Sequence, residues 1–198
     1  CEFFDDGMRT QAAARLEIES ALHRATERDE LRLAYQPVVE IATGRTVGVE
    51  ALLRWDHPQH GLLDPKDFIP LAEETGLILP MGTWALHEAL RQWSRWRQRL
   101  DDPGLTLAVN LSARQLRDPD LAATVAEALA RHGVGPWELC LELTESSFMA
   151  DVERHGRTLA ELQALGVQLA IDDFGTGYSS LTWLQRFPVT ILKIDQSF

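Results

Sequence analysis

The sequence predicts an α/β barrel with polar side chains gathered at one end of its strands. Short apolar runs alternate with longer stretches of helical periodicity, a pattern typical of parallel strands joined by right-handed helical crossovers. Within each run the apolar residues occupy one face and a charged or amide residue occupies the other, so the polar faces share an interior. A chain of 198 residues is long enough for one domain with a substantial core.

Six segments have the length and the alternation of strands. In chain order they are Leu33–Val39, Thr46–Trp55, Leu105–Ser112, Leu139–Ser146, Val167–Phe174 and Val189–Asp195. The first two are separated only by Glu40–Arg45, with Thr43-Gly44 as the turn, so the first strand should run antiparallel to the second.

Helices are predicted between the strands from amphipathic spacing. They cover Asp67–Thr75, Trp84–Leu100, Leu116–His132 and Asp151–Leu165. Gly133 and Gly166 end the last two, as glycine commonly does at a helix C-terminus. Pro58, Gly61 and Pro65 predict a loop before the first of these helices. Residues 1–30 should form a lead-in with a helix of its own, and residues 31–198 the domain.

Composition limits the functions that the chain can have. Its formal net charge of −11 argues against binding of long nucleic acid, for which a basic surface is expected. It contains two cysteines, Cys1 and Cys140, so no disulfide framework is predicted and a reducing cytoplasm fits best. No apolar run is long enough to cross a membrane, so no membrane contact is expected from this segment. The chain begins with Cys1 rather than Met, so we expect it to be part of a longer protein.

Acidic residues recur at the inward positions of the predicted strands. The inward polar set is Glu50, Asn110, Glu142, Asp172, Asp173 and Asp195, with Arg54 and Lys193. Carboxylates that converge in a pocket of low dielectric constant must be protonated, paired or bound to a metal. Oxygen ligands favour Mg²⁺, Mn²⁺ or Ca²⁺ over zinc, and no histidine falls on an inward position, since His57 and His60 are expected in a loop. Adjacent Asp172 and Asp173 suit two ions that clamp the attacking and leaving oxygens at a phosphorus atom.

Two other interpretations fit the same residues. Arg54 and Lys193 would be purely structural partners of Glu50 and Asp172 if the inward charges are buried ion pairs. That interpretation requires five strands to place an unneeded polar group on one side near the same end, which makes it the weaker one. Carboxylate-bound Mg²⁺ with a nearby lysine also describes an enolase-type site that removes a proton beside a carbonyl group. The spacing of the residues does not separate this chemistry from phosphodiester hydrolysis.

The amino-acid sequences of seven motifs resemble those of the EAL domain of bacteria. In order they are Tyr35-Gln36-Pro37, Glu50-Ala51-Leu52 leading into Leu53-Arg54-Trp55, Phe68-Ile69-Pro70-Leu71-Ala72-Glu73, Val109-Asn110-Leu111-Ser112, Glu142-Leu143-Thr144-Glu145, Asp172-Asp173-Phe174-Gly175-Thr176-Gly177 and Lys193-Ile194-Asp195. The resemblance implies a TIM-like (β/α)8 barrel whose first strand is antiparallel, with about six of the eight strands in this chain. It also implies hydrolysis of cyclic di-GMP to linear pGpG, with two Mg²⁺ or Mn²⁺ ions as cofactor and Ca²⁺ as an inhibitor.

The resemblance assigns a role to each matched residue. The metal ligands would be Glu50, Asn110, Glu142, Asp172 and Asp173. Lys193 would position or deprotonate the attacking water, which makes the catalytic set Glu50, Asp172 and Lys193. The substrate would be held by Gln36, Leu52, Arg54 and Asp195. Glu145 would anchor the loop after Asp173 instead of binding metal, and strand alternation agrees because it places Glu145 opposite Glu142.

The resemblance extends beyond the predicted barrel. Phe3-Phe4-Asp5-Asp6-Gly7-Met8 and the helix after it resemble the tail and linker of a GGDEF domain, the module that makes cyclic di-GMP, so we expect such a domain upstream. Two strands that the family places after the sixth lie beyond Phe198, so we expect open edges at the first and sixth strands and an unstable, nearly inactive isolated chain.

Two non-enzymatic functions stay open beside hydrolysis. One is a receptor that binds cyclic di-GMP without cutting it, and the other is a structural or dimerising module, with a homodimer compatible with either. Every metal ligand that the chain covers is present, which favours the enzyme over the receptor. The presence of Arg54, Lys193 and Asp172-Asp173 counts against a structural module.

Overall fold

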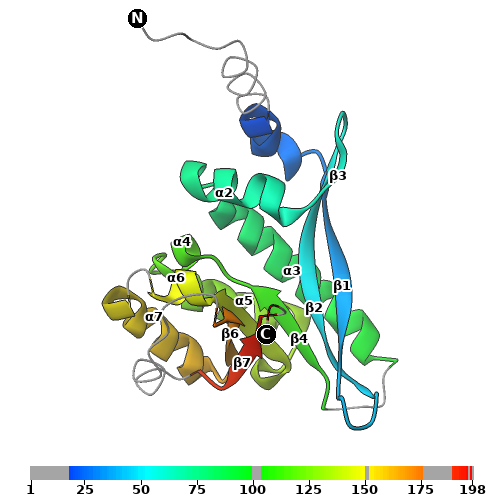
Figure 1. Ribbon diagram of the computed structural model, residues 1–198, viewed down its shortest axis with the longest axis vertical. Coiled ribbons are helices and arrows are strands. Elements are labelled where there is room, and N and C mark those ends of the chain that lie inside the picture. Colours follow the sequence, from blue (N-terminus) through cyan, green and yellow to red (C-terminus); the bar gives the residue numbers. More distant parts are fainter. Residues whose placement is uncertain (1–17, 100–103, 150–151, 176–188, 196, 198) are drawn as a thin grey trace, which may run out of the picture.

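The polypeptide is organised around one twisted sheet (Figure 1). A computed structural model describes residues 18–99, 104–149, 152–175, 189–195 and 197. The strands are β1 (Leu31–Val39), β2 (Thr46–His57), β3 (Gly61–Leu63), β4 (Thr106–Asn110), β5 (Leu139–Thr144), β6 (Gln168–Phe174) and β7 (Ile191–Ile194). Their order in the sheet is β1-β2-β4-β5-β6-β7, and β3 pairs with β2.

Strand directions confirm the predicted topology. β1 pairs antiparallel with β2, with Leu31 opposite Trp55 and Gln36 opposite Glu50, and each later pair along the path from β2 to β7 is parallel. Within the described residues the sheet does not close on itself, so β1 and β7 are its edges. The parallel strands bring their carboxyl ends to a common side, where sites form in barrels of this kind.

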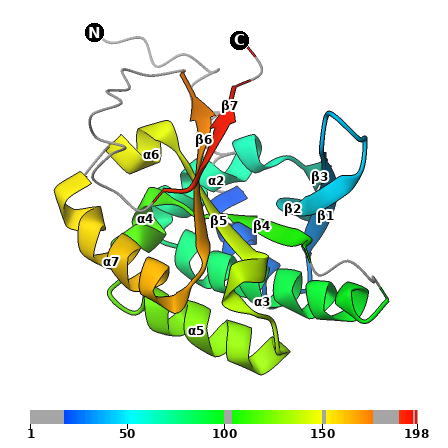
Figure 2. The same cartoon turned by 90° about the horizontal axis from the view of Figure 1, so that it is seen from below.

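Three long helices cover the outer face of the sheet, as Figure 2 shows from below. They are α3 (Ile78–Arg97), α5 (Leu121–His132) and α7 (Val152–Leu165). The connections contain α2 (Pro65–Thr75), α4 (Ala113–Leu116), the short 3-10 helix η1 (Pro136–Glu138) and α6 (Glu145–Met149). None of the helices described has both the length and the apolar character needed to cross a membrane.

The main core lies between the sheet and these three helices. Leu107, Leu141 and Leu169 project outward from successive strands and pack with Leu90 and Val125 of the helices, all of them buried. Because successive strand residues point to opposite faces, this outward apolar set leaves the inward positions free for polar groups. Each buried leucine contributes roughly 1.5–3 kcal/mol relative to exposure, so this layer holds the helices to the sheet.

A second core lies where β1 begins and β2 ends. Trp55, Phe68 and Met81 pack there with Leu22 and Ala25 from the helical residues 18–25. Leu22 and Ala25 are 1% and 0% exposed, so this first helix is part of the folded unit.

Several predicted boundaries differ from those observed. The helix predicted at Asp67 begins at Pro65, because proline is favoured in the first helical turn. The helix predicted at Trp84 begins at Ile78, and Pro80 is tolerated there because the N–H groups of the first turn need no helical partner. The stretch Leu116–His132 is divided between α4 and α5, since Pro119 disfavours a helical conformation in the residue before it.

The predicted loop around Gly61 and the predicted end of the fourth strand were also wrong. Residues Gly61–Leu63 form β3, and His57 is the buried last residue of β2. The strand predicted to reach Ser146 ends at Thr144, whose hydroxyl accepts a hydrogen bond from the backbone N–H of Ser147 and so begins α6. Glu145 is therefore the first residue of α6 and not a strand residue.

Glu138 joins α3 to the start of β5 and offers a test of the core. It is 5% exposed, and its carboxylate accepts hydrogen bonds from Trp93 Nε1 at 3.0 Å, from the Gly135 backbone N–H at 2.9 Å and from Arg97. Removing this acceptor leaves buried donors without a hydrogen-bond partner. Glu138→Ala should therefore lower the free energy of unfolding by about 3–5 kcal/mol in chemical denaturation. Glu161→Ala removes an ion pair with the exposed Arg157 and should change it little; equal losses in the two variants would contradict the assignment.

Candidate metal and substrate site

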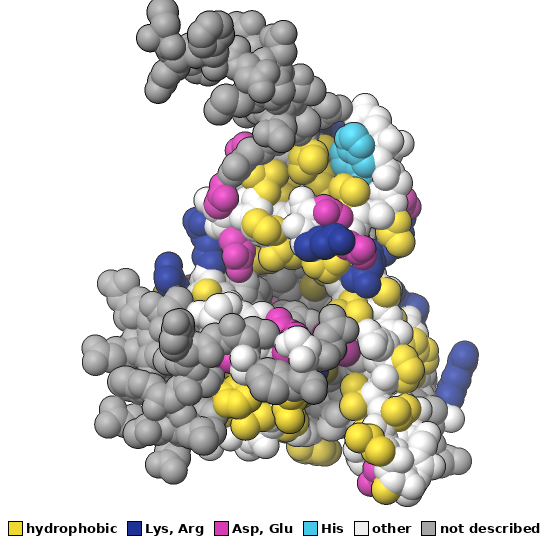
Figure 3. Space-filling model, in the orientation of Figure 1, with side chains coloured by type: hydrophobic (Ala, Val, Ile, Leu, Met, Phe, Trp, Pro, Cys, Tyr) yellow, Lys and Arg dark blue, Asp and Glu magenta, His cyan; other side chains and the backbone are white. Residues whose placement is uncertain are grey.

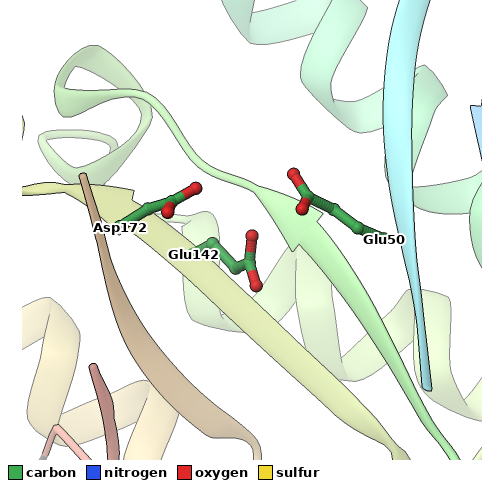
Figure 4. Close-up of side chains that lie close together, drawn as sticks. All are labelled: Glu50, Glu142 and Asp172. Carbon is green, nitrogen blue, oxygen red and sulfur yellow. The ribbon is translucent and has the colours of Figure 1, made fainter. Parts of the chain in front are cut away.

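Three carboxylates from three strands meet at the carboxyl end of the sheet. Glu50 of β2, Glu142 of β5 and Asp172 of β6 point toward a common point in Figure 4, and one oxygen of each lies within 4.8 Å of the others. The sheet register explains the convergence. Glu50 is level with Ala108, and Glu142 is level with Ala170, so small side chains on the neighbouring strands leave room for the acidic ones.

Lys193 of β7 lies among the three carboxylates. Its Nζ donates to Glu50 Oε2 at 2.9 Å, to Glu142 Oε2 at 2.6 Å and to Asp172 Oδ2 at 3.0 Å. Asn110 Nδ2, at the end of β4, donates to the second oxygen of Glu50 at 2.8 Å. Five residues predicted to share the site are thus in one hydrogen-bonded group.

The electrostatics of this group favour an additional cation. Burial, together with the nearby charge of Glu50, raises the pKa of Glu142 to about 7 against the opposing hydrogen bond from Lys193. Burial lowers the pKa of Lys193, but its hydrogen bonds to Glu142, Glu50 and Asp172 outweigh this effect and raise it above the ordinary lysine value. A single ammonium group faces three carboxylates, so the site holds an excess of negative charge.

The donor atoms fit a hard divalent cation. All three converging ligands are carboxylate oxygens, the donors that Mg²⁺, Mn²⁺ and Ca²⁺ prefer. In the described part of the chain, this is the one group of three or more acidic, histidine or cysteine side chains with ligand atoms so close together.

The turn after β6 places Asp173 beside the group and not inside it. Asp173 has a φ of 54°, and its backbone N–H donates to Asp172 Oδ1 at 2.9 Å. Its side chain is exposed overall. The partial loss of solvent around its carboxylate, together with the charges of Asp172 and Asp195, raises its pKa. Asp195 follows β7, and its backbone N–H donates a hydrogen bond to the carbonyl of Phe174 at 3.3 Å. These two carboxylates therefore flank the three that converge.

Glu145 lies behind the turn. It is 4% exposed, and its Oε2 accepts the backbone N–H of Gly175 at 2.7 Å. Gly175 has a φ of 101°, a conformation that glycine adopts without strain. The carboxylate of Glu145 therefore contacts the backbone after Asp173, and it is outside the group of converging oxygens.

Glu145→Ala should lower turnover or metal affinity by about 10–100-fold, the usual effect of a group that orients metal ligands. The reason is loss of the hydrogen bond that fixes Gly175, two residues after Asp173. Glu145→Gln keeps an oxygen acceptor, so its turnover and metal affinity should fall less than those of Glu145→Ala. Metal titration and turnover of both variants check this expectation, and direct coordination of a metal by Glu145 would refute it.

A groove of about 510 Å³ opens beside the carboxylates. Glu50, Asn110 and Asp173 line it at the site, and apolar side chains of β2, β4 and α3 line much of the rest. Figure 3 shows the hollow on this face of the molecule, with acidic side chains along its lower side. The fourth wall is α2, whose contributing residues are Pro65, Lys66, Ile69, Pro70 and Glu73.

The structure places one of the predicted substrate-binding residues in the lining of this groove and the others outside that lining. Leu52 lines it. Arg54 forms an ion pair with Asp64, with its Nε 3.2 Å from Oδ1, and does not contact the carboxylate group. Gln36 is exposed on the edge strand β1, level with Glu50.

The wall formed by α2 was missed from sequence. Lys66, Ile69, Pro70 and Glu73 recur at intervals of three or four residues, so they share one face of the helix. That periodicity was a usable signal, because it marks a face distinct from the buried Phe68, Leu71 and Ala72.

Comparison with known proteins agrees with this fold. A family model described as the EAL domain matches residues 19–198. The bifunctional diguanylate cyclase/cyclic di-GMP phosphodiesterase MucR of Pseudomonas aeruginosa is 48% identical over 198 residues, which is 99% of this chain and 28% of that protein. The chain therefore spans little more than a quarter of the length of this curated relative.

Solved structures extend the similarity to three dimensions. The PaMucR phosphodiesterase in complex with c-di-GMP has a TM-score of 0.86 and 49% identity, over 91% of this chain and 73% of that one. The EAL enzyme Bd1971, in a form with cAMP and cyclic di-GMP bound, has a TM-score of 0.86 and 32% identity, over 94% of this chain and 51% of that one. The match to the family model and the agreement with these structures lead to one conclusion: the chain belongs to the EAL domain family.

Proposed function

We propose that this domain hydrolyses cyclic di-GMP to linear pGpG in a metal-dependent reaction. The observation that carries the proposal is the convergence of Glu50, Glu142 and Asp172 around Lys193, at the end of a groove. MucR, which is 48% identical, is named a cyclic di-GMP phosphodiesterase, and the similar PaMucR structure holds c-di-GMP.

The metal ligands would come from the residues already gathered at the strand ends. Glu50, Glu142 and Asp172 offer converging carboxylate oxygens, Asn110 lies against Glu50, and Asp173 would extend the site toward a second ion. Bound Mg²⁺ or Mn²⁺ would lower the pKa of a water molecule and offset the charge that develops at phosphorus. Ca²⁺ is larger and less strict in geometry, so we expect it to inhibit.

The chain's own residues would prepare the substrate for attack. Lys193 would orient the attacking water through one N–H of its ammonium group, which would exchange a carboxylate partner for the water when those carboxylates bind metal. Arg54 carries a planar guanidinium group that suits a phosphate oxygen, and it would exchange its partly exposed partner Asp64 for the ligand. Leu52 would pack against the ligand in the groove, and Gln36 and Asp195 would supply further polar contacts to it.

The relatives also bear on the protein around this domain. MucR is bifunctional and much longer than this chain, which supports the proposal of a GGDEF domain upstream. The motif on which that proposal depends, Phe3 to Met8, lies outside the described residues. We also propose a cytoplasmic location and a homodimer for the full-length protein.

Analysis of the reaction product tests the proposed function. The full-length protein is incubated with cyclic di-GMP and Mg²⁺ in ¹⁸O-labelled water, and the nucleotides are separated and weighed by mass spectrometry. We expect pGpG that carries one labelled oxygen. Recovery of intact cyclic di-GMP bound to the protein would instead identify a receptor, and recovery of unbound, uncut nucleotide would reject both functions.

A further inference from the structure

Helix α4 connects the metal-binding group to the groove. It begins three residues after Asn110, and its start is fixed by reciprocal hydrogen bonds: Ser112 Oγ accepts the Gln115 N–H at 3.2 Å, and Gln115 Oε1 accepts the Ser112 N–H at 3.0 Å. The backbone N–H of Leu111 donates to the carbonyl of Glu142 at 2.8 Å. The position of α4 is therefore tied to two of the proposed metal ligands.

Gln115 also ties α4 to α3. It is 8% exposed, and a Cβ atom added at Gly82 of α3 would lie 2.1 Å from its Nε2. Only glycine at position 82 allows this close approach. Contacts on this side therefore pack α4 closely against α3.

Arg114 of the same helix reaches in the opposite direction, to α2. Its Nη1 donates to the backbone carbonyls of Glu73 and Glu74, the latter at 3.1 Å. Both carbonyls belong to the last turn of α2, where carbonyl groups have no helical partner and the helix dipole attracts a cation. That turn contains no basic residue of its own, so the cation comes from 40 residues away in sequence.

The end of α2 is shaped to admit this guanidinium group. Gly76 follows the helix with a φ of 87°, and a Cβ atom there would lie 2.9 Å from Arg114 Nη2. Glu73, whose carbonyl receives the hydrogen bond, also lines the groove with Lys66 and Ile69 of the same helix. Arg114 thus joins the side of the groove formed by α3 and α4 to its α2 wall.

We propose that Arg114 is a positioning residue that sets the distance of α2 from Asn110 and Glu50, and so the width of the groove for its ligand. This inference rests on the proposed function, because it takes that ligand to be a cyclic dinucleotide. Arg114 does not contact the three converging carboxylates, so its loss should weaken ligand binding more than chemistry.

The test compares Arg114→Ala with Arg117→Ala in the full-length protein. Arg117 is an exposed arginine three residues along, and it serves as the matched control. We expect KM for cyclic di-GMP to rise about 10-fold in Arg114→Ala, the effect of losing a charge-assisted hydrogen bond, with kcat and the Mn²⁺ midpoint nearly unchanged. Arg114→Lys keeps the positive charge but lacks the planar guanidinium group, so its KM should lie between those of the wild type and Arg114→Ala.

Hydrogen exchange supplies a readout that does not depend on catalysis. Backbone amides of residues 65–75 should exchange faster in Arg114→Ala than in Arg117→Ala, while those of β4 and β6 keep their protection. Unchanged exchange in α2, or a KM equal to that of Arg117→Ala, would overturn the inference. Faster exchange in a protein that neither binds nor cleaves cyclic di-GMP would reject the proposed function and the ligand named here, and would limit Arg114 to a structural contact.

Discussion

Glu50→Ala is expected to reduce kcat for cyclic di-GMP by about 1,000-fold or more, well beyond the 10–100-fold effect of a group outside the metal ligands. Glu50 contributes one of the three converging carboxylates, and it also accepts hydrogen bonds from Asn110 and Lys193. Its removal therefore takes away a ligand and two contacts that hold the remaining ones in place. Turnover measured at saturating Mg²⁺ checks the expectation.

Two further variants separate the ligand from its surroundings. Glu50→Gln keeps the shape and one oxygen, but loses the charge, so we expect most of the same loss. Glu40→Ala changes an exposed glutamate of the β1–β2 turn whose side chain accepts a hydrogen bond from Thr43, and it should keep full activity. Wild-type turnover in Glu50→Ala, with the fold intact by circular dichroism, would remove the carboxylate group from the mechanism.

Lys193→Met is expected to have two separable effects. Without divalent metal, the three carboxylates lose their ammonium partner, so the free energy of unfolding should fall by roughly 2 kcal/mol; this is below the value for a fully buried pair because solvent reaches Lys193. Turnover should fall by about 100–1,000-fold, the range for removal of one donor that is aimed at the reacting groups.

Metal should reverse the first effect and leave the second. A cation bound at Glu142 and its neighbours would replace the lost positive charge, and a 100-fold excess over Kd stabilises a folded protein by about 2.7 kcal/mol. Lys66→Met, which changes an exposed lysine at the groove, is the control for stability. Equal stability of the Lys193→Met and Lys66→Met variants in EDTA would show that Lys193 does not neutralise the site.

The converging carboxylates could be predicted from the sequence because side chains along a strand alternate with a period of two. Glu142 and Asp172 alternate with buried leucine and isoleucine residues, so their inward direction follows from the pattern, and neighbouring parallel strands bring them together. The antiparallel first strand was accessible for a similar reason, since the short turn after Val39 leaves no room for a crossover.

Arg54 shows where this reasoning fails. Alternation gives it the same direction as Glu50, yet pairing of β2 with β4 ends at Ala51 opposite Val109. Beyond that point β2 pairs with β1 and β3 and no longer with β4, and Arg54 forms an ion pair with Asp64, the residue that precedes α2. A strand's period gives the direction of a side chain but not the neighbour at the end of it.

Contacts between side chains and backbone are also hidden from sequence patterns. Arg114 binds two carbonyl groups of α2, and every residue has a carbonyl, so no pairing of residue types marks the contact. Helix boundaries were misplaced for a related reason: the hydroxyl of Thr144 begins α6 through the Ser147 N–H, and this local hydrogen bond ended a strand whose apolar pattern had predicted a longer one.

Metal dependence tests the central claim most directly. The full-length protein is stripped with EDTA, exchanged into metal-free buffer and titrated with Mg²⁺, Mn²⁺ or Ca²⁺, and pGpG is quantified by anion-exchange chromatography. The proposed site predicts no cleavage without a divalent ion, recovery with Mg²⁺ or Mn²⁺, and no recovery with Ca²⁺. The recovered rate should rise in proportion to the ion bound by the wild type, and Glu50→Ala should not bind that ion. Cleavage of cyclic di-GMP at an undiminished rate in EDTA would contradict it.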